Sequence, residues 1–432
     1  MHLPRLAFTV FFVILIVNTP LFAQTLEFTN GMWLIDGKFI SKTVYADKGQ
    51  FTFQKPANID QVIDLKNNYC IPPFGDAHTH NFDGTYGLNE MIQKYFNEGI
   101  FYVQVLGNNG NGAKLARPIL QKENLVDVTY ANGLLTSSYG HGFYPYEPLA
   151  MGIYAPYQQL ALADSIKKSR LVENISYFFL DTIEDVDHKW NTIKSYNPDH
   201  LKIVLLDAKN YSEKRKAEKP GDNGLSEEVA AYVVKKAHQD GFRVFAHVET
   251  AEDARLCAKL GVDVLAHLPG YAWNGDATTK SEIALTKKDL SLFKKAQLTV
   301  IPTYSLDGTK TYDTNGVETI NSKNYKNVRA YKTKILRQLN KGGIPIALGT
   351  DSYGSTLMPE IDALISNKVF SNADLLEILS KTTPQSIFPK RKLGEIREGY
   401  EASFLVVEQN PIKNIQAIKT ISLKVKKGVL ID

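Results

Sequence analysis

Short runs of apolar residues recur along the middle of the chain and alternate with amphipathic stretches of helical period. Apolar runs of this kind are typical of parallel strands with both faces buried. Between them, the stretch 250–261 begins at Thr250, a favoured N-cap residue, and ends at Gly261, a favoured helix stop. Eight runs are found, at residues 71–78, 101–107, 127–135, 201–206, 242–247, 262–267, 298–304 and 344–350. Eight such strands separated by helices predict an α/β protein with a (β/α)8 TIM barrel.

The two ends of the chain have a different pattern, in which short β-rich runs alternate with turns. Neither end has enough strands to bury the face of a sheet alone, so the two ends are expected to pair into one small β-sandwich. The predicted domains are a composite β-sandwich of residues 24–70 plus 390–432 and a barrel of residues 71–389.

The first 23 residues have the pattern of an export signal. Arg5 precedes an apolar run at 6–17, a polar break follows, and small residues end at Ala23. The run is shorter than the roughly 20 apolar residues that cross a bilayer, which makes a membrane anchor the less favoured alternative. We therefore expect cleavage after Ala23, export to the periplasm or the medium, and no stable membrane span.

Composition and charge narrow the classes of partner. The chain has 432 residues, of which 44% are hydrophobic and 22% charged, as in ordinary folded proteins. Its 50 Lys and Arg against 46 Asp and Glu give a net charge of +4, without a run of five like charges. This predicts a small-molecule partner and no nucleic acid. Two distant cysteines, Cys70 and Cys257, do not make a disulfide scaffold.

Polar residues at the ends of the apolar runs are candidates for a metal site. His78 and His80 alternate along the first run, so their side chains point the same way. His247 ends the fifth run and His267 the sixth, and Asp351 follows the eighth. The carboxyl ends of barrel strands meet at one rim, so these five side chains are expected to converge there. Each histidine taken alone has the alternative of being a buried core residue.

Lys202 is a less obvious candidate at the fourth run. A charged lysine is a poor metal ligand, but its amine can take up carbon dioxide to form a carbamate whose two oxygens bridge two cations. The alternative is a lysine at a strand end that reaches solvent.

In several stretches the chain resembles metal-dependent amidohydrolases, of the imidazolonepropionase-like and prolidase-like branch with a binuclear site: VIDLKNNYCIPPFGDAHTH, VFAHVETAEDARLCAKLGVDVLAHLPG, IPIALGTDS and LGEIREGYEASFLVVEQNPI. The resemblance covers nearly the whole chain after residue 23. It implies two divalent metal ions, and zinc is the metal that suits imidazole and carboxylate ligands best. The implied ligands are His78, His80, carboxylated Lys202, His247, His267 and Asp351.

Four further residues are candidate substrate contacts. His141 matches a third-strand position that relatives use near substrate, and Glu249 stands where many relatives have a second histidine. Tyr144 belongs to the aromatic stretch 139–157, which is expected to form a wall or lid of the site, or else a loop packed on its own aromatics. Tyr304 ends the seventh run.

Together with the export signal, the resemblance implies an exported amidohydrolase that cleaves a C–N bond of an amide, cyclic amide or peptide-like substrate with metal-activated hydroxide, and with Asp351 as general acid and base. The same site also suits an Xaa-Pro dipeptidase, or a lactonase or esterase. A non-catalytic, metal-containing ligand-binding protein is the alternative outside enzymes. Asp351 argues against it, because a binding protein has no use for a proton shuttle.

Overall fold

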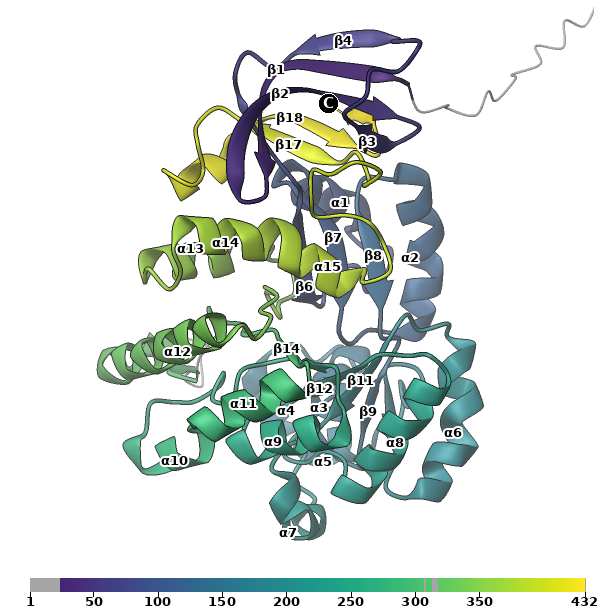
Figure 1. Cartoon of the computed structure of the whole chain (residues 1–432). Helices are drawn as coiled ribbons and strands as arrows, with labels where there is room; N and C mark the ends of the chain where they lie inside the picture. The colour runs from purple at the N-terminus through teal and green to yellow at the C-terminus, as the bar shows by residue number, and fades with distance from the viewer. Residues whose placement is uncertain (1–23, 307, 313–317, 432) are drawn as a thin grey trace, which may run out of the picture.

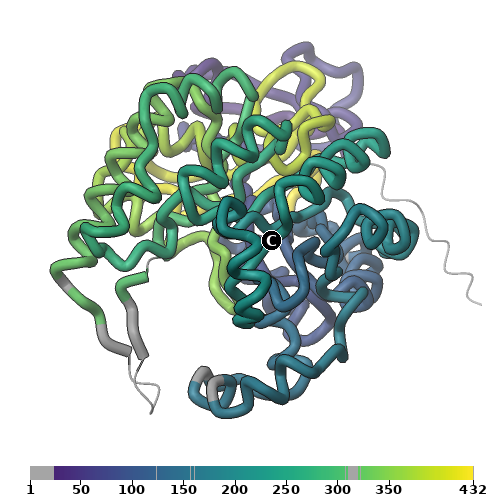
Figure 2. The backbone as a smooth tube through the Cα atoms, turned by 90° about the horizontal axis from the view of Figure 1, so that it is seen from below, coloured from purple at the N-terminus to yellow at the C-terminus, as the bar shows by residue number. Residues whose placement is uncertain are grey.

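The computed structural model describes residues 24–306, 308–312 and 318–431, and the predicted export signal lies outside this part. Figure 1 shows two units: strands from both chain ends lie together at the top, and the middle of the chain forms the larger unit below. Seen from below in Figure 2, the blue and teal segments lie on one side of the larger unit and the green segments on the other.

All eight predicted runs contribute to the barrel. Seven of them form the parallel strands β6 (Phe74–Thr79), β7 (Ile100–Val105), β8 (Asp127–Tyr130) with β9 (Leu134–Thr136), β11 (Leu201–Val204), β12 (Val244–His247), β13 (Val264–Leu265) and β14 (Thr299–Val300). The eighth closes the ring through a parallel bridge between Val300 and Ile346 and through the amide of Ala77, which donates to the carbonyl of Leu348.

Two features of the barrel differ from the predicted strands. The run 127–135 is divided into β8 and β9 by Asn132 and Gly133, which both have positive φ. An additional short strand, β10 (Tyr177–Phe179), pairs with the outer edge of β9. Sequence patterning missed β10 because three aromatic residues are too few to show a period.

The helices pack around the barrel, and their ends follow the capping signals in the sequence. The side chain of Thr250 accepts a hydrogen bond from the amide of Asp253 at the start of α9 (Ala251–Leu260), and Gly261 ends it with a φ of 83°, as predicted. The other long helices are α1 (Leu88–Asn97), α2 (Gly110–Glu123), α6 (Ile183–Ser195), α8 (Glu227–Gln239), α11 (Lys287–Lys295), α12 (Ser322–Gly342) and α13 (Met358–Ser366). Shorter helices are α5 (Ala163–Lys168), α7 (Tyr211–Ala217), α10 (Lys280–Ile283), α14 (Asn372–Glu377) and α15 (Thr383–Ile387), with one π-helical turn, η3 (Ile378–Thr382).

The aromatic stretch 139–157 contains helix α3 (Phe143–Ala150), and α4 (Pro156–Ala161) begins at its end. The fully buried Glu147 fixes α3, because its carboxylate accepts hydrogen bonds from the hydroxyl of Tyr177 (2.7 Å) and the amide of Val172 (2.9 Å). Phe143 packs on Tyr177 in a small aromatic cluster. This segment therefore packs on its own aromatic residues and, as described below, also lines the site.

The strands of both chain ends form one sheet of order β19-β18-β17-β5-β1-β2-β3, with β4 on β1. They are β1 (Leu26–Ile35), β2 (Lys38–Asp47), β3 (Gln50–Thr52), β4 (Gln61–Asp64), β5 (Tyr69–Ile71), β17 (Phe404–Val407), β18 (Ile421–Lys426) and β19 (Val429–Ile431). The pairing of β5 with β17 joins the two ends. The core between them is aromatic, with the ring of Phe404 4.9 Å from those of Phe28 and Trp33. The predicted barrel with a small β unit from both ends is confirmed, whereas the boundaries at residues 70 and 390 stay a prediction.

A buried ion cluster joins the amino end of the barrel to the sheet. The carboxylate of Asp127, at the start of β8, pairs with Lys426 and Arg391, each at 2.7 Å, and Arg391 also pairs with Glu401 at 2.7 Å. Burial alone would raise the pKa of the Asp127 carboxyl, but the charges of Lys426 and Arg391 outweigh it and lower this pKa to about 2. These charged groups are therefore mutually satisfied.

None of the helices in the described ranges is both long enough and apolar enough to cross a membrane.

Candidate metal centre and active site

The six predicted metal ligands line one cavity of about 220 Å³ at the carboxyl ends of the barrel strands. Its walls also include His141, Leu106, Leu134, Pro145, Tyr146, Val204, Tyr271 and Tyr353. The cavity is therefore a pocket of small-molecule size with a polar floor and largely apolar and aromatic walls.

The Asp351 carboxylate occupies the centre of the polar floor. Its Oδ1 atom lies 2.9 Å from Nε2 of His80 and 3.1 Å from Nε2 of His78, and its Oδ2 atom lies 3.7 Å from Nε2 of His267. One potential ligand atom each from His78, His267 and Asp351 lie within 4.8 Å of one another. This spacing suits a shared cation.

Backbone features hold the eighth strand end against the first. The amide of Asp351 donates to the carbonyl of His78 (2.7 Å), and Asp351 has a φ of 51°. Gly349 allows this approach, because a Cβ atom there would come within 2.5 Å of the Cβ of His78. Backbone strain of this kind concentrates at functional sites.

Hydrogen bonds to the far ring nitrogens fix two histidines as electron-pair donors. The Thr303 hydroxyl donates to the carbonyl of Pro302 and so accepts from Nδ1 of His267 (3.1 Å). Nδ1 of His80 donates to the carbonyl of Gly107 (3.0 Å). Both Nε2 atoms then face the Asp351 carboxylate, an arrangement that calls for a positive charge between them, which either a proton or a bound cation supplies.

Thr303 was not predicted. Its φ of 43° is unusual for a β-branched residue, and no local signal in the sequence indicates it.

Three buried nitrogen atoms in the cavity floor have no hydrogen-bond partner in the described part of the chain: Nζ of Lys202, Nε2 of His247 and Nδ1 of His78. Buried polar atoms are normally paired, so unpaired ones at a convergence point indicate a missing ligand. Burial lowers the pKa of Lys202 to about 7 and those of His247 and His78 to about 3 and 4. A neutral lysine amine is the form that reacts with carbon dioxide.

The Asp351 carboxylate raises the pKa of His80, whereas the pKa values of His78 and His247 are lowered. Burial alone would lower the pKa of His80, but the hydrogen bond and charge of Asp351 outweigh it and raise this pKa. The floor of the cavity thus favours a positive charge next to Asp351.

Aromatic rings hold the histidines from the side. The ring of Tyr271 stacks on His267 at 3.9 Å between centroids, His141 stacks on His247 at 4.2 Å, and Tyr353 lies 5.2 Å from His80. Tyr271 and Tyr353 follow His267 and Asp351 by four and two residues. They were not predicted, although residues just after barrel strands commonly line the site.

The structure places some of the candidate substrate contacts at the cavity and others away from it. His141 lines the cavity, and Oε1 of Glu249 lies 3.6 Å from Nε2 of His247 with the Glu249 side chain 40% exposed, at the rim. Tyr144 does not line the cavity, whereas its neighbours Pro145 and Tyr146 do.

Tyr304 is fully buried away from the cavity. Its amide donates to the carboxylate of Glu360 (2.6 Å), and its hydroxyl forms a hydrogen bond with Thr333 (2.9 Å). The expectation that Tyr304 contacts substrate is therefore wrong. The left-handed backbone at Thr303 ends the extended run and turns Tyr304 outward.

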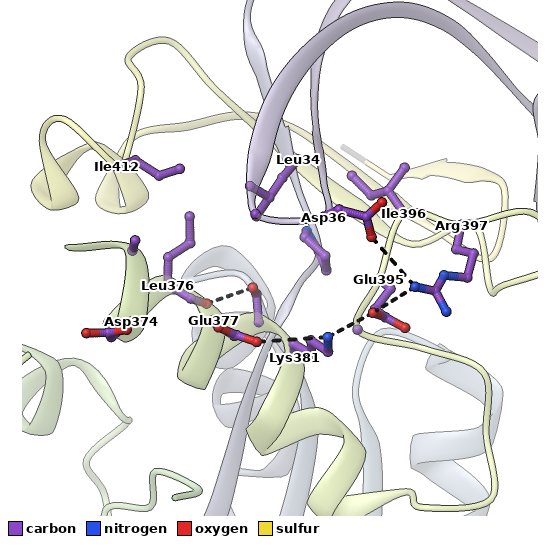
Figure 3. A pocket seen from close by; sticks show the side chains of 15 residues that line it. Leu34, Asp36, Asp374, Leu376, Glu377, Lys381, Glu395, Ile396, Arg397 and Ile412 are labelled. Atoms are coloured by element: carbon purple, nitrogen blue, oxygen red, sulfur yellow. Dashed lines mark hydrogen bonds and ion pairs between the residues drawn. The ribbon is translucent and has the colours of Figure 1, made fainter. Parts of the chain in front are cut away.

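A second hollow, of about 260 Å³, lies between the sheet and helix α14 (Figure 3). Its charged side chains pair with one another: Glu395 with Lys381 at 2.9 Å and with Arg397 at 3.5 Å, and Arg397 with Asp36 at 3.7 Å. It contains none of the unpaired nitrogens found in the barrel cavity, so the barrel cavity is the better candidate for chemistry.

A comparison with protein families extends the description of this site to most of the chain. The model of the Amidohydrolase family matches residues 69–431. The chain belongs to the amidohydrolase family. The family is typically metal-dependent, and the chain carries a candidate metal site.

This amidohydrolase is similar to several characterised proteins. An ochratoxinase from Aspergillus niger is 24% identical over 197 residues, which are 45% of this chain and 38% of that protein. Among solved structures, an Xaa-Pro dipeptidase has a TM-score of 0.69 at 17% identity, covering 94% of this chain and 100% of the other. The A. niger ochratoxinase structure has a TM-score of 0.69 at 16% identity, covering 94% and 96%. At this identity the structures indicate a shared fold.

Proposed function

We propose that this amidohydrolase hydrolyses the C–N bond of a small, largely apolar amide at a divalent metal centre. The observation that carries the proposal is the set of unpaired nitrogens on the cavity floor, with the His80 and His267 lone pairs aimed at Asp351. These nitrogen atoms are electron-pair donors, and the charged group that they face is a carboxylate. A divalent cation would bind the nitrogen atoms and neutralise the carboxylate.

Six residues would hold the metal. The proposed ligands are His78, His80, Lys202, His247, His267 and Asp351. Imidazole nitrogens and carboxylate oxygens suit zinc, and a carbamate on Lys202 would add the two oxygens that a pair of ions needs. When bound, the metal lowers the pKa of a water from about 15.7 to about 7 and polarises the scissile carbonyl.

The chain's own residues handle the proton. The neighbouring histidines outweigh the effect of burial and hold the pKa of Asp351 well below its ordinary range, so its carboxylate is ionised and able to accept a proton. Asp351 would pass this proton to the leaving nitrogen. Burial lowers the pKa of His141 to about 3, so its ring is neutral and can donate an N–H to the substrate.

The rim favours one class of leaving group. Among the described residues that line the cavity there is no arginine, and the only lysine is the proposed ligand Lys202. A free carboxylate on the leaving group would find no arginine and no other lysine among these lining residues, and it would face the carboxylate of Glu249 at the rim. We therefore favour amides with uncharged leaving groups over Xaa-Pro dipeptides. Dipeptidase activity remains the second candidate because of the fold shared with an Xaa-Pro dipeptidase.

We also propose that the protein is exported and that its signal is removed after Ala23. N-terminal sequencing of the protein recovered outside the cytoplasm tests this. A mature chain that begins at residue 24 is expected, and an uncleaved chain recovered from the cytoplasm would contradict the proposal.

Substrate profiling of the zinc-loaded protein tests the activity. The panel contains N-acyl amides, N-acyl amino acids, Xaa-Pro dipeptides and lactones of similar size, and the chelator-treated protein is the control. We expect N-acyl amides with uncharged leaving groups to have the highest kcat/KM and chelation to abolish turnover. Full turnover after chelation, or lactones as the only substrates, would contradict the proposal.

A further inference from the structure

Helices α11 and α12 have a large net positive charge. The 21 residues of α12 include seven Lys or Arg and no Asp or Glu, and α11 has four lysines and a single acidic residue, Asp289. Together they carry a net charge of +10, whereas the whole chain carries +4. The remaining residues therefore have a net negative charge, and the excess of basic over acidic residues is concentrated on two adjacent helices.

The exposed charges of α12 form a continuous stripe. They recur at intervals of three or four residues, or of eight across Ala330, so they share one face of the helix over about 27 Å. The stripe consists of Lys323, Lys326, Lys334, Arg337 and Lys341. The other two basic residues of α12, Arg329 and Lys332, are buried and donate to the carbonyls of Ser305 and Leu306.

Helix α11 extends this stripe into a wider surface. Nζ of Lys294 donates to the carbonyl of Gly342 at the end of α12 (3.0 Å), so the two helices meet there. Four lysines of α11 are exposed: Lys287, Lys288, Lys294 and Lys295. We call these four residues and the five of the stripe the basic face. Figure 1 shows α12 at the outer edge of the molecule, and Figure 2 shows the green segments at that edge.

In the part of the chain that the structure describes, the charges of the basic face are not paired with acidic side chains. Within the described residues, no side chain of the basic face forms an ion pair with a carboxylate, whereas Lys419 nearby pairs with Asp362. Like charges three or four residues apart, such as Lys334 with Arg337 and Arg337 with Lys341, destabilise a helix. Arg337 donates to the carbonyls of Lys368 (2.7 Å) and Val369 (3.2 Å), whereas the four lysines of the stripe have no hydrogen-bond partner among the described residues. The chain thus keeps lysine charges that lower the stability of α12, which is expected if an external anionic partner neutralises them.

The composition of the basic face favours a lipid surface over a nucleic acid. Eight of its nine residues are lysines, whose compact charges on flexible stems adapt to a diffuse negative surface, whereas arginine is the residue that binds single phosphates in bidentate fashion. Base stacking needs exposed aromatic rings, but Tyr325 of α12 is half-buried under the guanidinium of Arg329, 4.8 Å from its ring. Clusters of four to eight basic residues on a helix are sufficient for binding to anionic bilayers.

Two further features fit a bilayer. An open groove of about 690 Å³ follows the stripe, with Lys326, Lys334 and Arg337 in its walls, and gives phosphate headgroups access to these charges. Ile320, just before α12, is 48% exposed and provides an apolar contact. We propose that the basic face docks this enzyme on the surface of membranes that contain anionic lipids.

Vesicle sedimentation of the full chain tests the proposal. The vesicles are pure phosphatidylcholine or phosphatidylcholine with about 30% phosphatidylglycerol. We expect binding to the anionic vesicles alone, and at least a tenfold weaker affinity when salt shortens the Debye length from about 10 Å to about 3 Å. The variant Lys323→Gln/Lys326→Gln/Lys334→Gln/Lys341→Gln is expected to bind at least tenfold more weakly. Because like-charge repulsion is relieved, its melting temperature at low salt should equal or exceed that of the wild type.

Two control variants separate the basic face from net charge and from folding. Lys38→Gln/Lys48→Gln/Lys122→Gln/Lys413→Gln removes the same charge from exposed lysines elsewhere and should bind within twofold of the wild type. Replacing the same four stripe lysines by arginine keeps the charge and should preserve vesicle binding. Equal losses in the two glutamine variants, binding to uncharged vesicles, or binding to single-stranded RNA or free inorganic phosphate without binding to vesicles would overturn the proposal.

Discussion

The two ends of the barrel both contain buried charged or polar side chains, but these are paired at one end and unpaired at the other. At the amino end, Asp127 lies 2.7 Å from both Lys426 and Arg391. At the carboxyl end, Nζ of Lys202 and Nε2 of His247 have no hydrogen-bond partner among the described residues. Lys426 at one end and Lys202 at the other are both fully buried, so burial of the lysine does not distinguish the two ends.

The difference separates stability from function. A paired cluster is complete within the folded chain and stabilises the junction of sheet and barrel. Unpaired buried nitrogens cost stability, and they are retained where an external ligand completes them. The amino end should therefore respond to mutation with a change in unfolding free energy, and the carboxyl end with a change in metal binding and turnover.

The largest effect is expected for Asp351→Asn. The amide keeps the shape of the carboxylate but cannot accept the proton, so kcat should fall by about 10³-fold while metal stays bound. Steady-state kinetics and metal analysis of the same sample measure both quantities. Asp362→Asn, which alters an exposed ion pair with Lys419, is the matched control. Turnover at the wild-type rate in Asp351→Asn would remove Asp351 from the mechanism.

Asp127→Asn tests whether the paired ion cluster at the amino end of the barrel contributes to stability. It leaves Lys426 and Arg391 without a full counter-charge and should lower the unfolding free energy by about 3 kcal/mol, with metal content unchanged. Because the folded pKa of Asp127, about 2, lies below its ordinary 3.8, the carboxylate stabilises the fold above pH 4. This contribution is lost as the pH falls towards 2, so wild type and variant should converge there. Urea unfolding at several pH values tests this, and a constant difference down to pH 2 would contradict it.

A smaller effect is expected from removal of the Thr303 hydroxyl, which accepts a hydrogen bond from Nδ1 of His267. Thr303→Val keeps the shape but removes the acceptor that fixes the ring, so the affinity for zinc should fall roughly tenfold. Titration with zinc against a competing chelator measures this, with Thr303→Ser as the variant that keeps the hydroxyl. Equal losses in the valine and serine variants would show that packing, not the hydrogen bond, is responsible.

The smallest effect is expected at the rim. Glu249→Gln removes a negative charge that is 40% exposed, so a substrate with a free carboxylate should gain about fivefold in kcat/KM relative to its uncharged amide. Paired kinetics on an N-acyl amino acid and its amide measure the ratio. Glu252→Gln, in the first turn of α9, should leave the ratio unchanged. No change in Glu249→Gln would mean that this carboxylate does not face the substrate.

The convergence of the proposed ligands could be predicted because each lies on a recognisable strand or directly after one, and the ends of barrel strands share one rim. His78 and His80 follow from the period of two, and Asp351 follows the eighth run. Thr303 could not be predicted, because its role depends on a left-handed backbone and on a contact with His267, 36 residues away. The same backbone turn misplaced Tyr304, for which an extended run to residue 304 was assumed. Strand periodicity indicates which residues reach the rim, but it does not indicate which other residues hold their side chains in place.

Metal analysis of the full chain and of Lys202→Ala tests the central claim most directly. After incubation with zinc and bicarbonate followed by gel filtration, the wild type should retain two ions per chain. Lys202→Ala should retain about one or fewer, with partial recovery in a small carboxylic acid such as acetate. A wild-type protein that retains no zinc, or a Lys202→Ala protein that retains two ions without acetate, would contradict the account.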